Sequence, residues 1–201
     1  MQVGSVAAIF LAAGLSRRFG PDDKLVVPIG QRPLAGCGAA ALAGLPFAGR
    51  FAIVRSGAEE LEGLLTRQGF AVVRNDSPEL GLSHSIRLGV QAATGSSGVL
   101  IALADMPLIP ATHFRSLVDA LSEDCPIVAT RGPHGPMVPA AFAATCLDAL
   151  TGLTGEAGAR ALLGGAAIVE IAPDLLLDVD HPEQLARIRS AAAADPDASR
   201  A

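Results

Sequence analysis

The sequence predicts an α/β protein of three layers, in which helices cover both faces of a mostly parallel central sheet. Over residues 1–130, apolar runs of strand length alternate with segments of helical periodicity. Residues 6–12 and 98–104 are almost continuously apolar, which is typical of strands buried on both faces. A length of 201 residues and a hydrophobic content of 50% fit a single domain with its own core.

The expected elements follow one another as strand and helix in turn. Segment 58–68, for example, carries Leu61, Leu64 and Leu65 on one helical face. Five strands and four helices are expected in this part of the chain. The strands are residues 6–12, 51–55, 70–74, 98–104 and 126–130, and the helices are residues 34–45, 58–68, 83–93 and 110–121.

The last third of the chain is less regular. Three prolines, at positions 133, 136 and 139, are expected to break the chain before residues 140–150. No long linker or internal repeat divides the sequence, so residues 1–194 are expected to form one domain. Two short strands are expected at 168–171 and 175–179, a final helix at 182–194 and a disordered polar tail at 195–201.

Composition argues against several classes of partner. Aromatic residues make up 3% of the chain and the net charge is −5, so a nucleic-acid partner is not expected. No apolar stretch approaches about 20 residues, and the first apolar run reads as a strand, so neither a membrane span nor a signal peptide is expected. The three cysteines and four histidines are scattered, which favours a reducing cytoplasm and argues against a zinc site.

Lys24 is the single lysine of a chain that otherwise uses arginine as its cation. It ends a glycine-containing loop that follows the first expected strand. A lysine is a compact charge on a flexible stem and suits contact with a phosphate, whereas arginine is a planar fork. We therefore interpret Lys24 as a phosphate-binding residue. The alternative is that one lysine is present by chance in a composition biased toward arginine.

The loop before Lys24 reads Leu11-Ala-Ala-Gly-Leu-Ser-Arg-Arg-Phe-Gly. Small residues let backbone N–H groups approach an anion, and Ser16 and Arg17 or Arg18 can add polar contacts. The glycine spacing matches neither a dinucleotide-binding nor a Walker A loop. Gly14 and Gly20 are explained equally well as turn residues.

Carboxylates follow two other expected strands. Asp105 comes directly after residues 98–104, where an acidic side chain is a natural ligand for the Mg²⁺ of a nucleotide. Asp178 and Asp180 are two apart, so in an extended segment their side chains point to one side and favour a cation between them. The alternatives are helix capping by Asp105, and by Asp180 with Glu183 in a capping box.

Residues 75–89 leave one expected strand and enter a helix. Gly81 permits a turn, and Ser83 and Ser85 stand at the helix start, where free N–H groups favour an anion or the polar edge of a base. Asn75 ends the strand. An ordinary serine-capped helix explains the same pattern.

Taken together, these motifs resemble those of the nucleotidyltransferases related to molybdenum cofactor biosynthesis. The resemblance rests on the loop at 11–20, on Lys24-Leu, and on the serine segment at 75–89. Three further stretches extend it to nearly the whole chain: Ala104-Asp-Met-Pro-Leu108, Gly155-Glu-Ala-Gly-Ala-Arg160 and Asp178-Val-Asp-His-Pro-Glu183.

The resemblance implies a Rossmann-like nucleotidyltransferase fold and transfer of a nucleoside monophosphate from an NTP to a phosphorylated acceptor, with release of pyrophosphate. It implies that Lys24, Arg18 and Asp105 are catalytic and that Asp105 and Asp180 hold Mg²⁺, with Asp178 as the alternative second ligand. The residues implied to bind the nucleotide are Leu11, Ala12, Ala13, Gly14, Ser16, Arg18, Lys24, Asn75, Gly81, Ser83 and Ser85.

The Leu-Ala-Ala-Gly tetrapeptide resembles the cytidylyltransferase branch, which acts on molybdopterin cofactor, whereas Leu-Ala-Gly-Gly is typical of the guanylyltransferase branch. CTP and a phosphorylated pterin are therefore the expected substrates, with a molybdoenzyme or its maturation factor as a downstream partner. Phe19, His84 and Ala104 depart from the family pattern. The alternatives are transfer of GMP, a sugar or polyol phosphate acceptor, and a catalytically silent nucleotide-binding protein that acts in cofactor handover.

Overall fold

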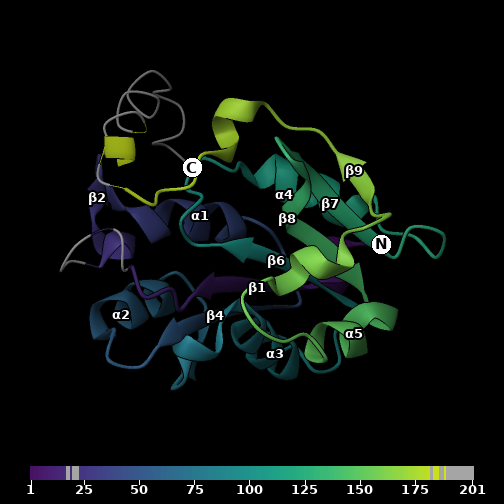
Figure 1. Ribbon diagram of the computed structural model, residues 1–201, viewed down its shortest axis with the longest axis horizontal. Helices are drawn as coiled ribbons and strands as arrows, with labels where there is room; N and C mark the ends of the chain where they lie inside the picture. The colour runs from purple at the N-terminus through teal and green to yellow at the C-terminus, as the bar shows by residue number, and fades with distance from the viewer. Residues whose placement is uncertain (17–18, 20–22, 182, 186–187, 189–201) are drawn as a thin grey trace.

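A computed structural model describes residues 1–16, 19, 23–181, 183–185 and 188. Its central sheet has seven strands in the order β5-β4-β1-β6-β8-β7-β9. In Figure 1, β1 crosses the middle of the view, with α1 above it and α3 and α5 below. Four of the strand pairs are parallel and β8 is antiparallel to both its neighbours, so the predicted mostly parallel sheet and three-layer α/β fold are confirmed.

The strands and α-helices expected in the first two thirds of the chain form in the predicted order, with ends within two residues of those expected, and a short hairpin at 28–33 was not predicted. The strands are β1 (Ala7–Ala12), β2 (Pro28–Ile29), β3 (Arg32–Pro33), β4 (Gly49–Arg55), β5 (Ala71–Asn75), β6 (Gly98–Leu103), β7 (Ile127–Gly132), β8 (Gly135–Ala143) and β9 (Ala167–Val169). The α-helices are α1 (Leu34–Ala43), α2 (Glu59–Arg67), α3 (Leu82–Ala92), α4 (Ala111–Asp119) and α5 (Leu147–Thr151). The 3₁₀ helices are η1 (Val3–Ser5), η2 (Lys24–Val26), η3 (Pro78–Leu80), η4 (Ala144–Cys146), η5 (Gly158–Leu162) and η6 (Pro173–Leu176). The short β2–β3 hairpin forms a separate sheet.

Two hydrophobic clusters lie on opposite faces of the sheet. Phe10 of β1 belongs to the cluster that includes side chains of α1, α2 and α4, and Ile9 belongs to the cluster that includes α3 and α5. This alternation follows from the period of two along a strand. Helix α3 packs so closely on β1 that a Cβ at Gly89 would overlap with Cγ2 of Ile9.

Strand β8 corrects the expectation that the three prolines break the chain before residues 140–150. Pro139 lies at an irregularity of the β7–β8 ladder, where the register shifts between Ala129 and Thr130, and a bulge tolerates a residue without an N–H donor. The Thr130 hydroxyl donates to the Pro139 carbonyl (2.6 Å) and pairs with Nε2 of His113 (2.8 Å). Side-chain hydrogen bonds therefore hold the strand where backbone pairing is interrupted.

The C-terminal part differs in one other place. Residues 175–179, expected as a strand, contain the end of η6 and then an extended segment outside the sheet. That segment is tied to the end of β6, because the Val179 N–H donates to the Asp105 carbonyl (3.0 Å). The expected helix at 182–194 falls mostly outside the described residues and the tail at 195–201 entirely so; a single domain over 1–194 stays a prediction. Within the described part of the chain, every helix is too short or too polar to span a bilayer.

Candidate active site

The carboxyl ends of four parallel strands meet at one edge of the sheet. Strands β1, β4, β5 and β6 run in the same direction, so their last residues and the residues that follow them lie at this edge. They bring Gly14, Arg55, Asn75 and Asp105 to one side of the molecule. Open α/β sheets bind ligands at such edges.

Lys24 lies at the centre of this edge and is buried, with its side chain 9% exposed. Its ammonium donates to Oδ2 of Asp105 (2.9 Å) and to Oδ1 of Asp180 (3.2 Å). Burial disfavours the charged amine, but the Asp105 carboxylate, together with Asp180, outweighs burial and raises the pKa of Lys24. Three of the predicted site residues are thus in direct contact, and Lys24 stays protonated.

The carboxylates suit a divalent cation. Asp105 and Asp180 already share one cation, the Lys24 ammonium, and Oδ1 of Asp105 is buried without a hydrogen-bond partner. No cluster of three His, Cys, Asp or Glu side chains is placed to hold a metal ion in the described ranges. Mg²⁺ commonly takes one or two carboxylates and completes its shell with phosphate oxygens and water, so two carboxylates fit it.

Asp178 lies beside the same cluster. Burial raises the pKa of its carboxyl, and the nearby charges of Asp105 and Asp180 raise it further. Its side chain lines a cleft, whereas Asp180 contacts Lys24. The backbone N–H of Asp180 donates to Oε1 of Gln184 (2.7 Å), so a glutamine side chain, and not Glu183, reaches back to this turn.

The loop after β1 brings small, mostly buried residues to the edge. Ala12 and Ala13 are buried, and Ser16 has a φ of +49°. Gly14 has no left-handed φ, and a Cβ there would meet no atom within 4 Å, so neither turn geometry nor packing requires glycine at this position. Arg18, together with Arg17 and Gly20, lies outside the described residues.

Asn75 and Ser85 form a buried pair between β5 and α3. The Asn75 amide donates from Nδ2 to Oγ of Ser85 (2.9 Å), and its Oδ1 accepts the Ser77 N–H (2.9 Å). Both residues are fully or almost fully buried. The contacts hold the start of α3 against the end of β5.

Gly81 and Ser83 join the start of α3 to a distant loop. Gly81 has a φ of +88°, and a Cβ there would lie 2.8 Å from the Gly155 carbonyl, so the fold itself requires glycine here. The Ser83 N–H donates to the Gly155 oxygen (3.1 Å). Its hydroxyl is buried and has no partner, so it remains available as a hydrogen-bonding group.

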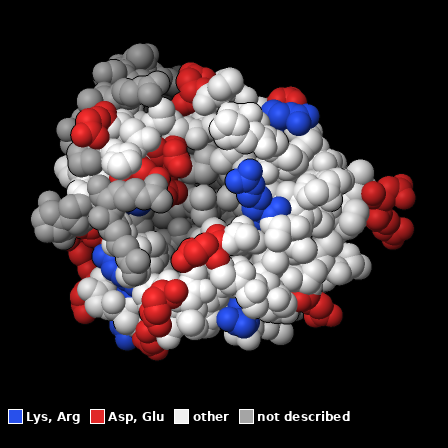
Figure 2. All heavy atoms as spheres, viewed as in Figure 1, with Lys and Arg blue, Asp and Glu red and all other residues white. Residues whose placement is uncertain are grey.

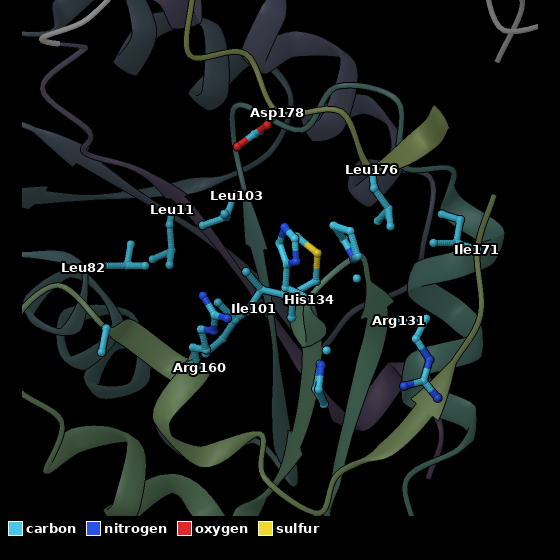
Figure 3. A pocket seen from close by; sticks show the side chains of 18 of the residues that line it. Leu11, Leu82, Ile101, Leu103, Arg131, His134, Arg160, Ile171, Leu176 and Asp178 are labelled. Atoms are coloured by element: carbon cyan, nitrogen blue, oxygen red, sulfur yellow. The ribbon is translucent and has the colours of Figure 1, made fainter. Parts of the chain in front are cut away.

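A cleft of about 650 Å³ lies beside the end of β1, the start of α3 and Asp178. Figure 2 shows the hollow in this face of the molecule, with acidic and basic side chains at its rim. Figure 3 shows Asp178 at one end and Arg131 and Arg160 toward the other, with Leu11 and Leu103 between them. Its lining is largely apolar and also comes from α3, from the turn between β7 and β8, and from residues 170–178.

Sequence reasoning missed two features of the site. Arg55 contacts both flanks of the loop after β1, through the Gly14 carbonyl (3.2 Å) and the Asp23 carboxylate (2.7 Å). A charged residue at the end of an otherwise apolar strand was a signal that could have found it. The apolar wall contributed by β8 was also missed, because the strand itself was not expected.

Comparison with known proteins adds a family. A family model described as "MobA-like NTP transferase domain" matches residues 8–171. The purine catabolism protein PucB of Bacillus subtilis (strain 168) is 35% identical over 121 residues, which are 56% of this chain. The chain spans 58% of the length of PucB and 28% of that of a bifunctional protein GlmU from Rhizorhabdus wittichii, to which it is 34% identical.

Solved structures share the fold over almost the whole chain. A homologue of Mycobacterium tuberculosis Rv0371c from Mycobacterium sp. strain JC1 superposes with a TM-score of 0.83 at 24% identity, covering 96% of this chain and 99% of that chain. A nucleotidyl transferase from Methanothermobacter gives 0.80 at 25% identity, with coverages of 94% and 98%. A molybdopterin-guanine dinucleotide biosynthesis protein A from Archaeoglobus fulgidus gives 0.67 at 15% identity, with coverages of 91% and 100%.

Proposed function

Because the chain belongs to the MobA-like NTP transferase family, we propose that it transfers CMP from CTP to the phosphate of molybdopterin cofactor and releases pyrophosphate. The observation that carries this proposal is the contact of Lys24 with Asp105 and Asp180 at the carboxyl edge of the sheet. One buried cation and two carboxylates there provide charges of both signs for a triphosphate and its metal. The Leu11-Ala-Ala-Gly14 sequence favours CTP over GTP.

The proposed reaction is an in-line displacement. An oxygen of the acceptor phosphate attacks the α-phosphorus, the bond to the bridging oxygen breaks, and pyrophosphate leaves. The acceptor is already anionic, so no covalent protein nucleophile and little general-base help are needed. Catalysis of this type consists mainly of positioning and charge stabilisation.

Each predicted residue has a proposed part in this reaction. Lys24 neutralises charge that develops on the phosphates, and backbone N–H groups of the loop after β1 orient them, with Gly14 leaving open space for the nucleotide. Asp105 and Asp180 would hold Mg²⁺, which when bound neutralises negative charge on the triphosphate. Arg18 is a further proposed phosphate contact. Ser16, Asn75, Gly81, Ser83 and Ser85 are proposed to shape the nucleotide pocket.

The cleft supports an acceptor with a ring system. Its wall includes Leu11, Leu103 and Met137, which offer apolar surface to a flat heterocycle, and Arg131 and His134, which can hydrogen-bond to polar groups at the edge of such a ring. Arg160 adds a positive charge to the lining. We therefore propose a phosphorylated pterin as the acceptor, with a sugar or polyol phosphate as the alternative. A cytoplasmic location and a molybdoenzyme or maturation factor as partner remain part of the proposal.

Thermal unfolding with each of the four NTPs, with and without Mg²⁺, tests nucleotide choice. A ligand at about 100 times its dissociation constant adds roughly 2.7 kcal/mol, which shifts the midpoint of a domain of this size by roughly 5–10 °C. We expect the largest shift with CTP and Mg²⁺. A larger shift with GTP would contradict the choice of CTP, and no shift with any nucleotide would contradict nucleotide binding and with it the proposed function.

A further inference from the structure

The loop between β1 and η2 is fastened at both ends by one side chain. Arg55 is the last residue of β4, the strand that pairs with β1 in parallel register. Its Nη1 donates to the Gly14 carbonyl (3.2 Å) and its Nη2 to Oδ2 of Asp23 (2.7 Å). A planar guanidinium suits this arrangement, because its N–H groups reach two acceptors at once.

Asp23 connects the contacts of Arg55 to the turn that carries Lys24. Its Oδ1 accepts the Leu25 N–H (3.0 Å), which caps the 3₁₀ helix that begins with Lys24, and a longer contact comes from the Ser16 hydroxyl (3.4 Å). The carboxylate therefore links Arg55 to the first turn of that helix. The ammonium of Lys24 in turn lies against Asp105.

The burial of this pair distinguishes it from an ordinary surface ion pair. The side chains of Arg55 and Asp23 are 21% and 14% exposed. Arg74 of β5 makes a two-point contact with Glu62 of α2 (2.9 and 2.8 Å), but its side chain is 65% exposed. Water screens the second pair more strongly, so it contributes less to local order. Arg74 therefore provides a matched control on the neighbouring strand.

We infer that Arg55 is a positioning residue that joins Gly14 to Asp23 and, through Asp23, holds Lys24 ready to contact a triphosphate. We call the contacts of Arg55 with Gly14 and Asp23 the Arg55 clasp. The inference rests on the proposed nucleotidyl transfer and adds to it a residue that acts through its contacts with Gly14 and Asp23. Loss of the clasp leaves β4 in the sheet and lets the 3₁₀ helix that begins with Lys24 reorient.

Titration calorimetry with CTP and CMP, each with Mg²⁺, tests the clasp. Arg55→Ala is expected to weaken CTP binding by about tenfold or more, in line with the loss of a positioning contact next to a metal or phosphate site. CMP affinity should change less, because Lys24 is proposed to face the triphosphate. Arg55→Lys should recover part of the loss, Asp23→Asn should reproduce it, and Arg74→Ala should bind both nucleotides as the wild type does.

The outcomes separate the clasp from the proposed function. If the wild type binds CTP and Arg55→Ala binds it equally well, the clasp is overturned and the proposed function stands. An equal loss for CTP and CMP, accompanied by a lower midpoint of unfolding, shows a general structural role and also overturns it. If Arg55→Ala does not fold, Arg55→Lys and Asp23→Asn carry the same comparison. Wild-type protein that binds none of the four NTPs overturns both proposals.

Discussion

Replacing Lys24 by alanine is expected to lower the turnover of nucleotidyl transfer by roughly 10²–10³-fold, the usual cost of removing one charge contact with a transition state. The ammonium is the buried cation between Asp105 and Asp180. Without it, charge that develops on the phosphates is less well neutralised. The measurement is the initial rate of pyrophosphate release at saturating CTP, Mg²⁺ and acceptor.

Two further variants make the Lys24 result specific. Lys24→Arg keeps the charge but replaces a point donor by a planar fork, so it should recover only part of the rate. Arg67→Ala removes an exposed cation at the end of α2 and should leave the rate unchanged. Turnover of Lys24→Ala close to that of the wild type would show that this residue has no catalytic part.

Asp105→Asn is expected to raise the Mg²⁺ concentration needed for half-maximal rate by about tenfold or more, a range typical of disturbed metal sites. The substitution keeps the shape of the side chain and removes its charge. Oδ1 of Asp105, buried and without a partner, is the atom best placed to gain from a bound cation. The measurement is a Mg²⁺ titration of the transfer rate, with Asp148→Asn on α5 as the remote control.

The same titration decides between the two candidate second ligands. Asp180→Asn should shift the Mg²⁺ dependence as Asp105→Asn does, because both carboxylates contact Lys24. If Asp178→Asn shifts it instead, Asp178 is the second ligand. An unchanged titration for Asp105→Asn would remove Asp105 from the metal site.

The sequence was sufficient to predict the parallel part of the fold, and three residues that it singled out, Lys24, Asp105 and Asp180, lie in contact at its edge. Buried strands such as β1 and β6 are continuous apolar runs, and residues that follow parallel strands meet at one edge. This explains how Lys24, in the loop after β1, could be grouped with Asp105, which follows β6 and lies 81 residues away in the sequence. Asp180, 156 residues from Lys24, follows an extended segment outside the sheet and was grouped with them through the family resemblance. The roles assigned to these residues stay predictions.

What the sequence could not supply depends on contacts between distant segments. The prolines of β8 predict a break in the chain. Strand β8 nevertheless lies between β6 and β7, and this depends on a bulge and on the hydrogen bond from Thr130 to Pro139. The Arg55 clasp depends on the register of β4 against β1, which no local pattern encodes. The position of Gly81 against Gly155 is likewise a tertiary contact.

Transfer itself is the most direct test of the proposed function. The protein is incubated with CTP labelled at the α-phosphate, Mg²⁺ and molybdopterin cofactor, and both labelled product and pyrophosphate are measured. We predict that label moves to the pterin in equal amount to the pyrophosphate released, and that neither forms without the acceptor. Nucleotide binding without transfer to this acceptor would contradict the account and leave a different phosphorylated acceptor or a handover protein.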